Sequence, residues 1–235
     1  GGNEISGSIP EAIGELVSLD RLSIGVDSWS DYKLSGAVPS SIGNLVNLTE
    51  LNLEGNDLSS LPENIGDLAS LKIMNFDANE LTEIPSSIGS LTNLTKLTLQ
   101  ANQITEIPTT IGSLEYLNLH GNQITVIPEE IGSLTNLKEL HLSVNQITEI
   151  PSSIGSLTNL VQLGVYENQL TGAIIPEICD LTNLYFLALW SNNLTGDIPS
   201  CIGDLTNLKT LELFGNNLTG KIPSRIGELT KLENL

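Results

Sequence analysis

The chain has 235 residues, of which 28 are acidic and 9 are basic, and its formal net charge is −19. A charge of this sign and size repels nucleic-acid phosphates and anionic lipid headgroups, so we expect neither as a partner. Aliphatic side chains have to build the core, because aromatic residues make up only 4% of the chain.

The chain opens without the basic start and apolar run of a signal peptide, since it begins Gly1-Gly2-Asn3-Glu4. The longest apolar run extends from Leu184 to Trp190 and is too short to cross a bilayer. We therefore expect no membrane insertion.

A repeat of about 23 residues runs along the chain, and prolines mark its period. The first full units have prolines 23 residues apart, at Pro39, Pro62, Pro85 and Pro108. The following spacings are 20, 23, 25, 23 and 24 residues, ending at Pro223. The longer distance from Pro10 to Pro39 indicates an insertion near residues 27–32, which holds Trp29. We expect about ten repeats in a single domain, residues 1–235, incomplete at both ends.

Each unit contains the pattern L-x-x-L-x-L-x-x-N-x-L, as in Leu94 to Ile104. The alternating L-x-L predicts a short strand with its leucines inward, and neighbouring units place these strands side by side in a parallel sheet. In the return segment, proline limits helix to a short turn and glycine permits a tight bend. No unit can bury its leucines alone, so stacking of the units makes the core.

One asparagine falls at the same place in each repeat, where the chain leaves the strand. A carboxamide can satisfy buried backbone groups of two adjacent turns, because it both donates and accepts hydrogen bonds. We interpret these residues as a structural ladder: Asn56, Asn79, Asn102, Asn122, Asn145, Asn168, Asn192 and Asn216.

The units Leu194 to Pro199 and Leu218 to Pro223 read L-T-G-x-I-P, and the middle units read T-E-I-P with one residue fewer. The chain resembles the leucine-rich-repeat family, and these units are similar to those of plant receptor-kinase ectodomains and polygalacturonase inhibitors. The resemblance implies an α/β solenoid, a horseshoe with a parallel sheet on its concave side and short helical, 3-10 or extended segments on its convex side. It also favours an extracellular or cell-surface location and a protein or peptide ligand. The paired-cysteine cap that usually precedes plant extracellular repeats is absent.

Residues that flank the inward leucines point to the concave face. Tyr166, Trp190 and Phe214 occupy the same slot in three consecutive repeats and should stack about 5 Å apart. Tyr116 and Phe186 project from the same face. Exposed aromatic residues mark interaction sites, so we predict that these five bind a ligand. The alternative, that they only pack on one another, stays open.

His120 and His141 lie on adjacent strands of this face and are further candidates for ligand contact. Their diagonal spacing of roughly 7–8 Å is long for shared metal ligation, so we predict no metal site and no cofactor. The chain carries no nucleophile elbow, phosphate loop or paired-carboxylate motif, and we expect no enzyme. Glu50, Glu54 and Asp77 make the N-terminal half of the face acidic, which suits a basic partner. The alternative, that these carboxylates only face solvent, stays open.

Cys179 and Cys201 lie at non-equivalent positions of adjacent repeats. One comes two residues before Leu181 and the other four before Leu205, so we expect two separate thiols rather than a disulfide. Four Asn-x-Thr glycosylation sequons coincide with the repeat consensus and indicate nothing about glycosylation.

The leading hypothesis is a recognition module that binds a protein or peptide on its concave face, as the ligand-binding part of a larger receptor. Self-association is also expected, because no following repeat covers Leu229, Leu232 and Leu235. The alternative is an ice- or polymer-binding surface that uses regular hydroxyl side chains. These are Ser59, Thr82, Thr105, Thr125, Thr148, Thr171, Thr195 and Thr219.

Overall fold

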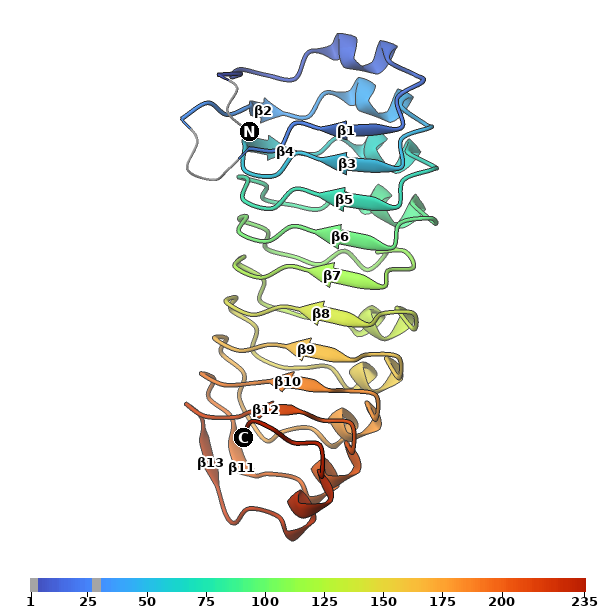
Figure 1. Ribbon diagram of the computed structural model, residues 1–235. Coiled ribbons are helices and arrows are strands. Elements are labelled where there is room, and N and C mark those ends of the chain that lie inside the picture. The colour runs from blue at the N-terminus through green and yellow to red at the C-terminus, as the bar shows by residue number, and fades with distance from the viewer. Residues whose placement is uncertain (1–3, 27–30) are drawn as a thin grey trace. The chain divides into compact units, whose positions relative to one another are not determined.

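The computed structural model describes residues 4–26 and 31–235 and forms two compact units, Gly1–Gln123 and Ile124–Leu235. Most of the predicted insertion at residues 27–32, including Trp29, lies outside the described residues. The expectation of a single domain over residues 1–235 stays a prediction. Each unit is a stack of repeats (Figure 1).

In the first unit, one short strand from each repeat joins a parallel sheet. Its strands, in spatial order, are β1 (Arg21–Ser23), β3 (Glu50–Asn52), β5 (Ile73–Asn75), β6 (Lys96–Thr98) and β7 (Tyr116–Asn118). The central residue of each strand is an inward Leu or Met, and these residues pair in register, as Leu97 does with Leu117. A second parallel pair, β2 (Ser35–Ala37) and β4 (Asp57–Ser60), lies on the flank.

The second unit repeats this arrangement. Its main sheet contains β8 (Glu139–His141), β9 (Gln162–Gly164), β10 (Phe186–Ala188) and β12 (Thr210–Glu212), all parallel. The flank strands β11 (Thr195–Asp197) and β13 (Asn217–Thr219) overlap the two L-T-G-x-I-P segments and pair in parallel. Main-sheet strands three residues long, joined by return segments, agree with the predicted solenoid.

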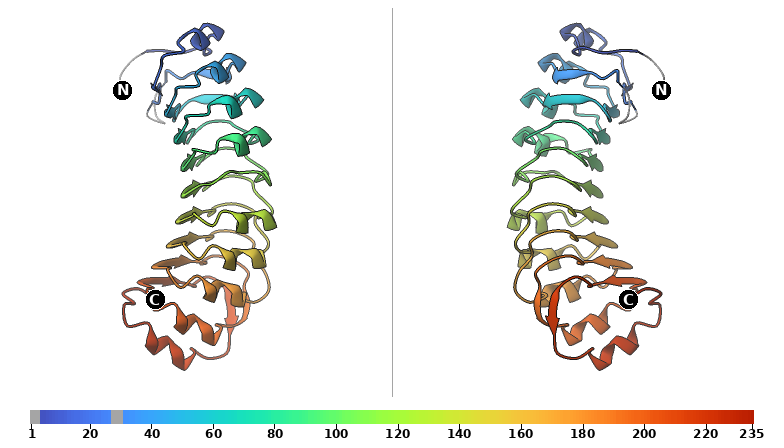
Figure 2. Two further views of the ribbon diagram at one scale, coloured as in Figure 1. Left: turned by 90° about the vertical axis from the view of Figure 1, so that its right-hand side faces the viewer. Right: turned by 90° about the vertical axis from the view of Figure 1, so that its left-hand side faces the viewer.

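The return segments form 3-10 helices of five residues. They are η1 (Glu11–Glu15), η2 (Ser40–Asn44), η3 (Glu63–Asp67), η4 (Ser86–Ser90), η5 (Glu129–Ser133), η6 (Ser152–Ser156), η7 (Pro176–Asp180), η8 (Ser200–Asp204) and η9 (Ser224–Glu228). In each unit the helices line the side opposite the main sheet (Figure 2). The 20-residue repeat has no helix between Pro108 and Leu114. Within the described residues, every helix is too short to span a bilayer.

The asparagine of each repeat connects neighbouring turns through its carboxamide. Asn168 Oδ1 accepts a hydrogen bond from the Ile147 backbone N–H at 2.9 Å, in the preceding turn. Its Nδ2 donates to the carbonyl oxygens of Leu142 at 3.0 Å and Val165 at 3.2 Å. The residue before the asparagine has positive φ in every described full repeat, whether it is glycine or, as at Val144 with φ 57°, a branched residue.

Adjacent 3-10 helices approach closely through the glycine of several Ile-Gly pairs. A Cβ atom built on Gly132 would lie 2.7 Å from Ser153 Cβ of the next turn, and one on Gly203 would lie 2.7 Å from Arg225 Cβ. These distances are too short for two real Cβ atoms. The glycine of one turn therefore faces the second residue after proline in the next turn.

The two cysteines form a disulfide, with 5.8 Å between their Cα atoms, so the prediction of two separate thiols is wrong. Cys179 replaces the glycine of the Ile-Gly pair, and Cys201 is the second residue after Pro199. These are the two positions that face each other between successive helices. The two cysteines have different positions within their repeats, which argued against a bond. The stacking of η7 on η8 brings these two different positions face to face.

We expect Asn168→Ala to lower the free energy of unfolding by about 1–3 kcal/mol, because buried backbone groups lose their partners. Denaturant unfolding measures the change, and Gln169→Ala is the matched control, since Gln169 is the exposed neighbour. Equal stability of the two variants would contradict a structural role for the carboxamide.

Candidate functional site

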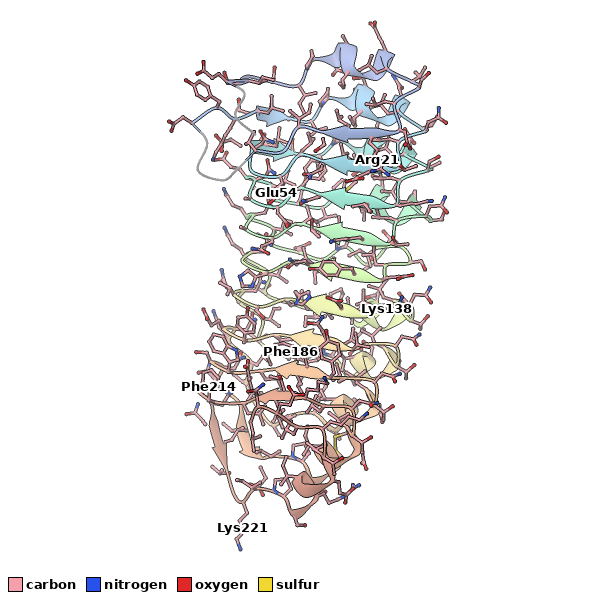
Figure 3. All side chains as sticks on the ribbon, in the orientation of Figure 1. Arg21, Glu54, Lys138, Phe186, Phe214 and Lys221 are labelled. Carbon is pink, nitrogen blue, oxygen red and sulfur yellow. A yellow bond between two sulfur atoms is a disulfide. The ribbon has the colours of Figure 1, made fainter. Side chains whose placement is uncertain are left out.

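The outward side chains of the main sheet form one face in each unit, which we call the open sheet face. Each repeat contributes the first and third residues of its strand and the residue two positions later, as in Lys96, Thr98 and Gln100. This is the face that the sequence predicts to be concave. Arg21, Glu54, Phe186 and Phe214 belong to it (Figure 3).

In the first unit the open sheet face carries a polar network. Asn75 Nδ2 donates to Glu54 Oε2 at 3.0 Å, and Asn75 Oδ1 accepts a hydrogen bond from Thr98 Oγ1 at 2.7 Å. At its edge Arg21 pairs with Glu50 at 3.4 Å. The carboxylates outnumber the cations here, so the open sheet face of the first unit is acidic.

Asp77 sits half-buried in this network. Burial raises the pKa of Asp77 to about 6, although the hydrogen bond from the Gln100 backbone N–H, 2.6 Å from Oδ1, favours the carboxylate. Repulsion by Glu54 raises the pKa further, while Thr98 and Lys96 lower it. Asp77 therefore changes charge at a mildly acidic pH.

Two of the predicted ligand-binding residues lie in this first unit. Tyr116 is half-buried on β7, and the Lys96 Nζ lies 4.7 Å from the centre of its ring. This cation–π contact was not foreseen from the sequence, although the first strand positions of consecutive repeats hold both residues. His120 is half-buried two residues after β7.

In the second unit three aromatic rings stack on consecutive repeats, and we call Tyr166, Trp190 and Phe214 the aromatic strip. The ring centres of Tyr166 and Trp190 lie 4.5 Å apart with an angle of 8° between the ring planes. Those of Trp190 and Phe214 lie 5.1 Å apart at 9°. Trp190 is thus covered on both faces and half-buried, whereas Phe214 is 64% exposed.

The other two candidates of the second unit lie on the same open face. Phe186 is half-buried at the start of β10, in register with Gln162 and Thr210. His141 Nε2 lies 3.4 Å from Glu139 Oε2 on β8. The structure brings the aromatic strip together, while Phe186 and His141 occupy other positions of the same face.

Among residues 4–26 and 31–235, no group of three or more His, Cys, Asp or Glu side chains gathers in a way that could hold a metal ion. In the first unit, polar side chains of the open sheet face bond to one another, as Asn75 does to Glu54 and Asn118 does to Gln100.

Sequence reasoning did not identify an apolar slot on the flank of the second unit, bordered by Glu149, Ala173 and Ile174. The signal for it was present, because the repeat from Pro151 to Pro176 is two residues longer than the preceding one.

Two models of repeat families match the chain. A model described as "Leucine-rich repeat region" matches residues 32–115 and 111–176, and one described as "Leucine Rich Repeat" matches residues 183–205 and 207–229. The chain belongs to the leucine-rich-repeat family. The family and the fold predicted from the repeat pattern are thereby confirmed.

Solved structures of plant proteins are similar to this leucine-rich-repeat chain. The plant peptide hormone receptor RGFR1, solved with RGF2, is 36% identical with a TM-score of 0.91, over 99% of this chain and 38% of that one. The Arabidopsis receptor kinase HAESA ectodomain, solved with an N-terminally extended IDA peptide hormone, is 36% identical with a TM-score of 0.83, over 96% of this chain and 38% of that one.

A plant ice-binding protein is 27% identical with a TM-score of 0.76, over 98% of this chain and 78% of that one. The chain spans only 38% of the length of each of the two receptors. No curated protein sequence matches it.

We expect Asp77→Asn to flatten part of the pH dependence of stability. The folded pKa of about 6 lies above the reference value of 3.8, so between these values the folded chain holds a proton that the unfolded chain has lost. The free energy of unfolding therefore falls as pH rises through this window, by linkage. Above a pH of about 6, the wild type should be less stable than Asp77→Asn.

Denaturant unfolding at a series of pH values measures the difference between wild type and Asp77→Asn. Asp67→Asn is the control, because Asp67 is an exposed aspartate of the same unit. Parallel pH profiles for wild type and Asp77→Asn would contradict the assignment.

Proposed function

We propose that the chain is a recognition module, not an enzyme, and that it binds an extended peptide on its open sheet face. The aromatic strip carries this proposal. Aromatic residues are scarce in this chain, yet three of them occupy one outward slot in successive repeats. Large, rigid side chains of this kind are enriched among residues that dominate binding energy.

The strip is an anchor of defined shape. Because Trp190 is stacked on both sides, Tyr166 and Trp190 present ring edges to a ligand along much of the strip. Ring edges carry partial positive charge and favour carbonyl oxygens or the faces of other rings. A peptide offers both along its backbone and side chains. Phe186 and His141 extend this surface in the second unit. On the open sheet face of the first unit, Tyr116 and His120 are the proposed contacts.

The relatives support the peptide class, since the RGFR1 and HAESA structures hold peptide hormones. By analogy, we propose that the chain is the ligand-binding part of a larger receptor at the cell surface or outside the cell. The disulfide between Cys179 and Cys201 is consistent with an oxidising compartment.

We further propose that the ligand is basic. The chain carries a net charge of −19, and the first unit presents Glu50, Glu54 and Asp77 on its open face. Opposite charge on the ligand would raise the association rate, and salt would weaken the effect. Self-association through the repeat at residues 210–235 stays a prediction. Of the three leucines expected to be uncovered there, Leu229 is buried, Leu232 is half-buried and Leu235 is exposed.

Phe214→Ala tests the strip, because Phe214 is the most exposed of its rings. Peptides selected on the wild-type chain from a phage-displayed random library should bind the variant about 2 kcal/mol more weakly, roughly thirtyfold in Kd. The melting temperature should change little, since exposed substitutions usually shift stability by about 0.5 kcal/mol. Titration calorimetry measures the affinity.

Tyr185→Ala is the matched control, because Tyr185 is an exposed aromatic residue one position before β10, beside Lys209 and Lys231. It should bind the selected peptides like wild type. If both variants bind like wild type while the peptides still compete with one another, the aromatic strip is packing and not recognition.

Ice binding is the alternative that a specific observation favours. The regular hydroxyl side chains are all exposed in the structure, at Ser59, Thr82, Thr105, Thr125, Thr148, Thr171, Thr195 and Thr219. A plant ice-binding protein has a similar structure. The glutamates Glu83, Glu106 and Glu149 stand beside this row, and unequal repeat lengths break its spacing, so we expect no thermal hysteresis. A measurable difference between the melting and freezing temperatures of ice in a dilute solution of the protein would favour ice binding.

A further inference from the structure

An apolar slot opens on the flank of the second unit, away from the open sheet face. It has a volume of about 230 Å³, and its walls are mainly aliphatic. Ile150, Ala173 and Ile175 stand at its mouth, where they are exposed or half-buried. Ile178 and Leu194 form part of its floor and are buried.

The slot arises from a change in repeat length. The Thr171 backbone N–H donates to the Thr148 carbonyl oxygen at 3.1 Å, which fixes the register of these two turns. Proline follows three residues after Thr148 but five residues after Thr171. The turn from Thr171 to Pro176 therefore contains two more residues than the turn from Thr148 to Pro151 on which it stacks. The slot lies beside these extra residues.

One carboxylate borders this apolar surface. Glu149 is exposed and lines the slot, and it has no ion pair within the part of the chain that the structure describes. The whole chain is strongly acidic, so an anionic group would be repelled here. An aliphatic group beside a cation is the chemistry that matches both features.

We propose that this slot binds a peptide segment in which leucine or isoleucine stands next to arginine or lysine. The aliphatic side chain enters the slot, and the cation pairs with Glu149. The volume suits one side chain and is below that of a usual small-molecule site. The slot is on the flank, so this site is distinct from the aromatic strip and does not depend on it.

Methyl NMR on the full chain tests the proposal, because Ile150, Ile174, Ile175 and Ile178 all line the slot. The probe is N-acetyl-leucyl-arginine amide, and N-acetyl-seryl-arginine amide is its control. The leucine probe should shift the δ1 methyl signals of these four residues saturably and leave that of Ile131 on η5 unchanged. The serine probe should produce no saturable shift.

Two substitutions separate the two parts of the site. Ala173→Leu fills the mouth and should abolish the saturable shifts with an unchanged melting temperature. Glu149→Gln should weaken binding of the leucine probe about threefold, the effect of an exposed ion pair. Glu106→Gln is its control, since Glu106 has the same place in another repeat. Phe214→Ala should leave the slot unaffected, which distinguishes this site from the strip.

The proposal is overturned if the leucine probe produces no saturable shift at the four isoleucines. It is also overturned if the serine probe shifts them equally, since charge alone would then account for the effect. Neither result depends on a variant that has to fold, and neither bears on peptide binding at the aromatic strip.

Discussion

The stacking of one turn of chain on the next is the interaction on which the rest of the structure depends. Leu97 lies in register with Met74 of the preceding strand and Leu117 of the following one, and it is buried because the neighbouring repeats cover it. Stacking of the turns also buries backbone N–H and carbonyl groups that have no partner in a sheet. A carboxamide such as that of Asn168 forms hydrogen bonds with these groups across two turns. Hydrophobic burial and hydrogen bonding therefore require the same spacing.

This spacing is imposed on whatever side chain points outward. A ring at the same slot of consecutive repeats has to lie about one strand separation from the next. Tyr166, Trp190 and Phe214 consequently form a stack, and their planes are nearly parallel. In the first unit the same rule places Asn75 beside Thr98, whose hydroxyl donates to Asn75 Oδ1. Glu54, from the neighbouring slot of the preceding repeat, accepts a hydrogen bond from Asn75 Nδ2. The core thus determines the geometry of the surface without restricting its chemistry.

Departures from the regular repeat produce the local features. A repeat of 20 residues has no room for a 3-10 helix between Pro108 and Leu114. A repeat of 25 residues opens the slot at Ala173, because its extra residues have no counterpart in the turn before it. Cys179 takes the place of a glycine that faces the next turn, and a disulfide forms where a close backbone contact otherwise lies.

The amino-acid sequence is sufficient to predict the period, the inward leucines, the positions of the asparagines and the family, because each follows from a local pattern that recurs. The folded structure is needed to find the disulfide, the half-burial of Trp190, the pKa of Asp77 and the contact of Lys96 with Tyr116. It also placed Val144 in a left-handed conformation that glycine adopts elsewhere. These properties depend on how far one turn is offset from the next and on which atoms then exclude water. The spacing of residues within a single repeat determines neither the offset nor the burial.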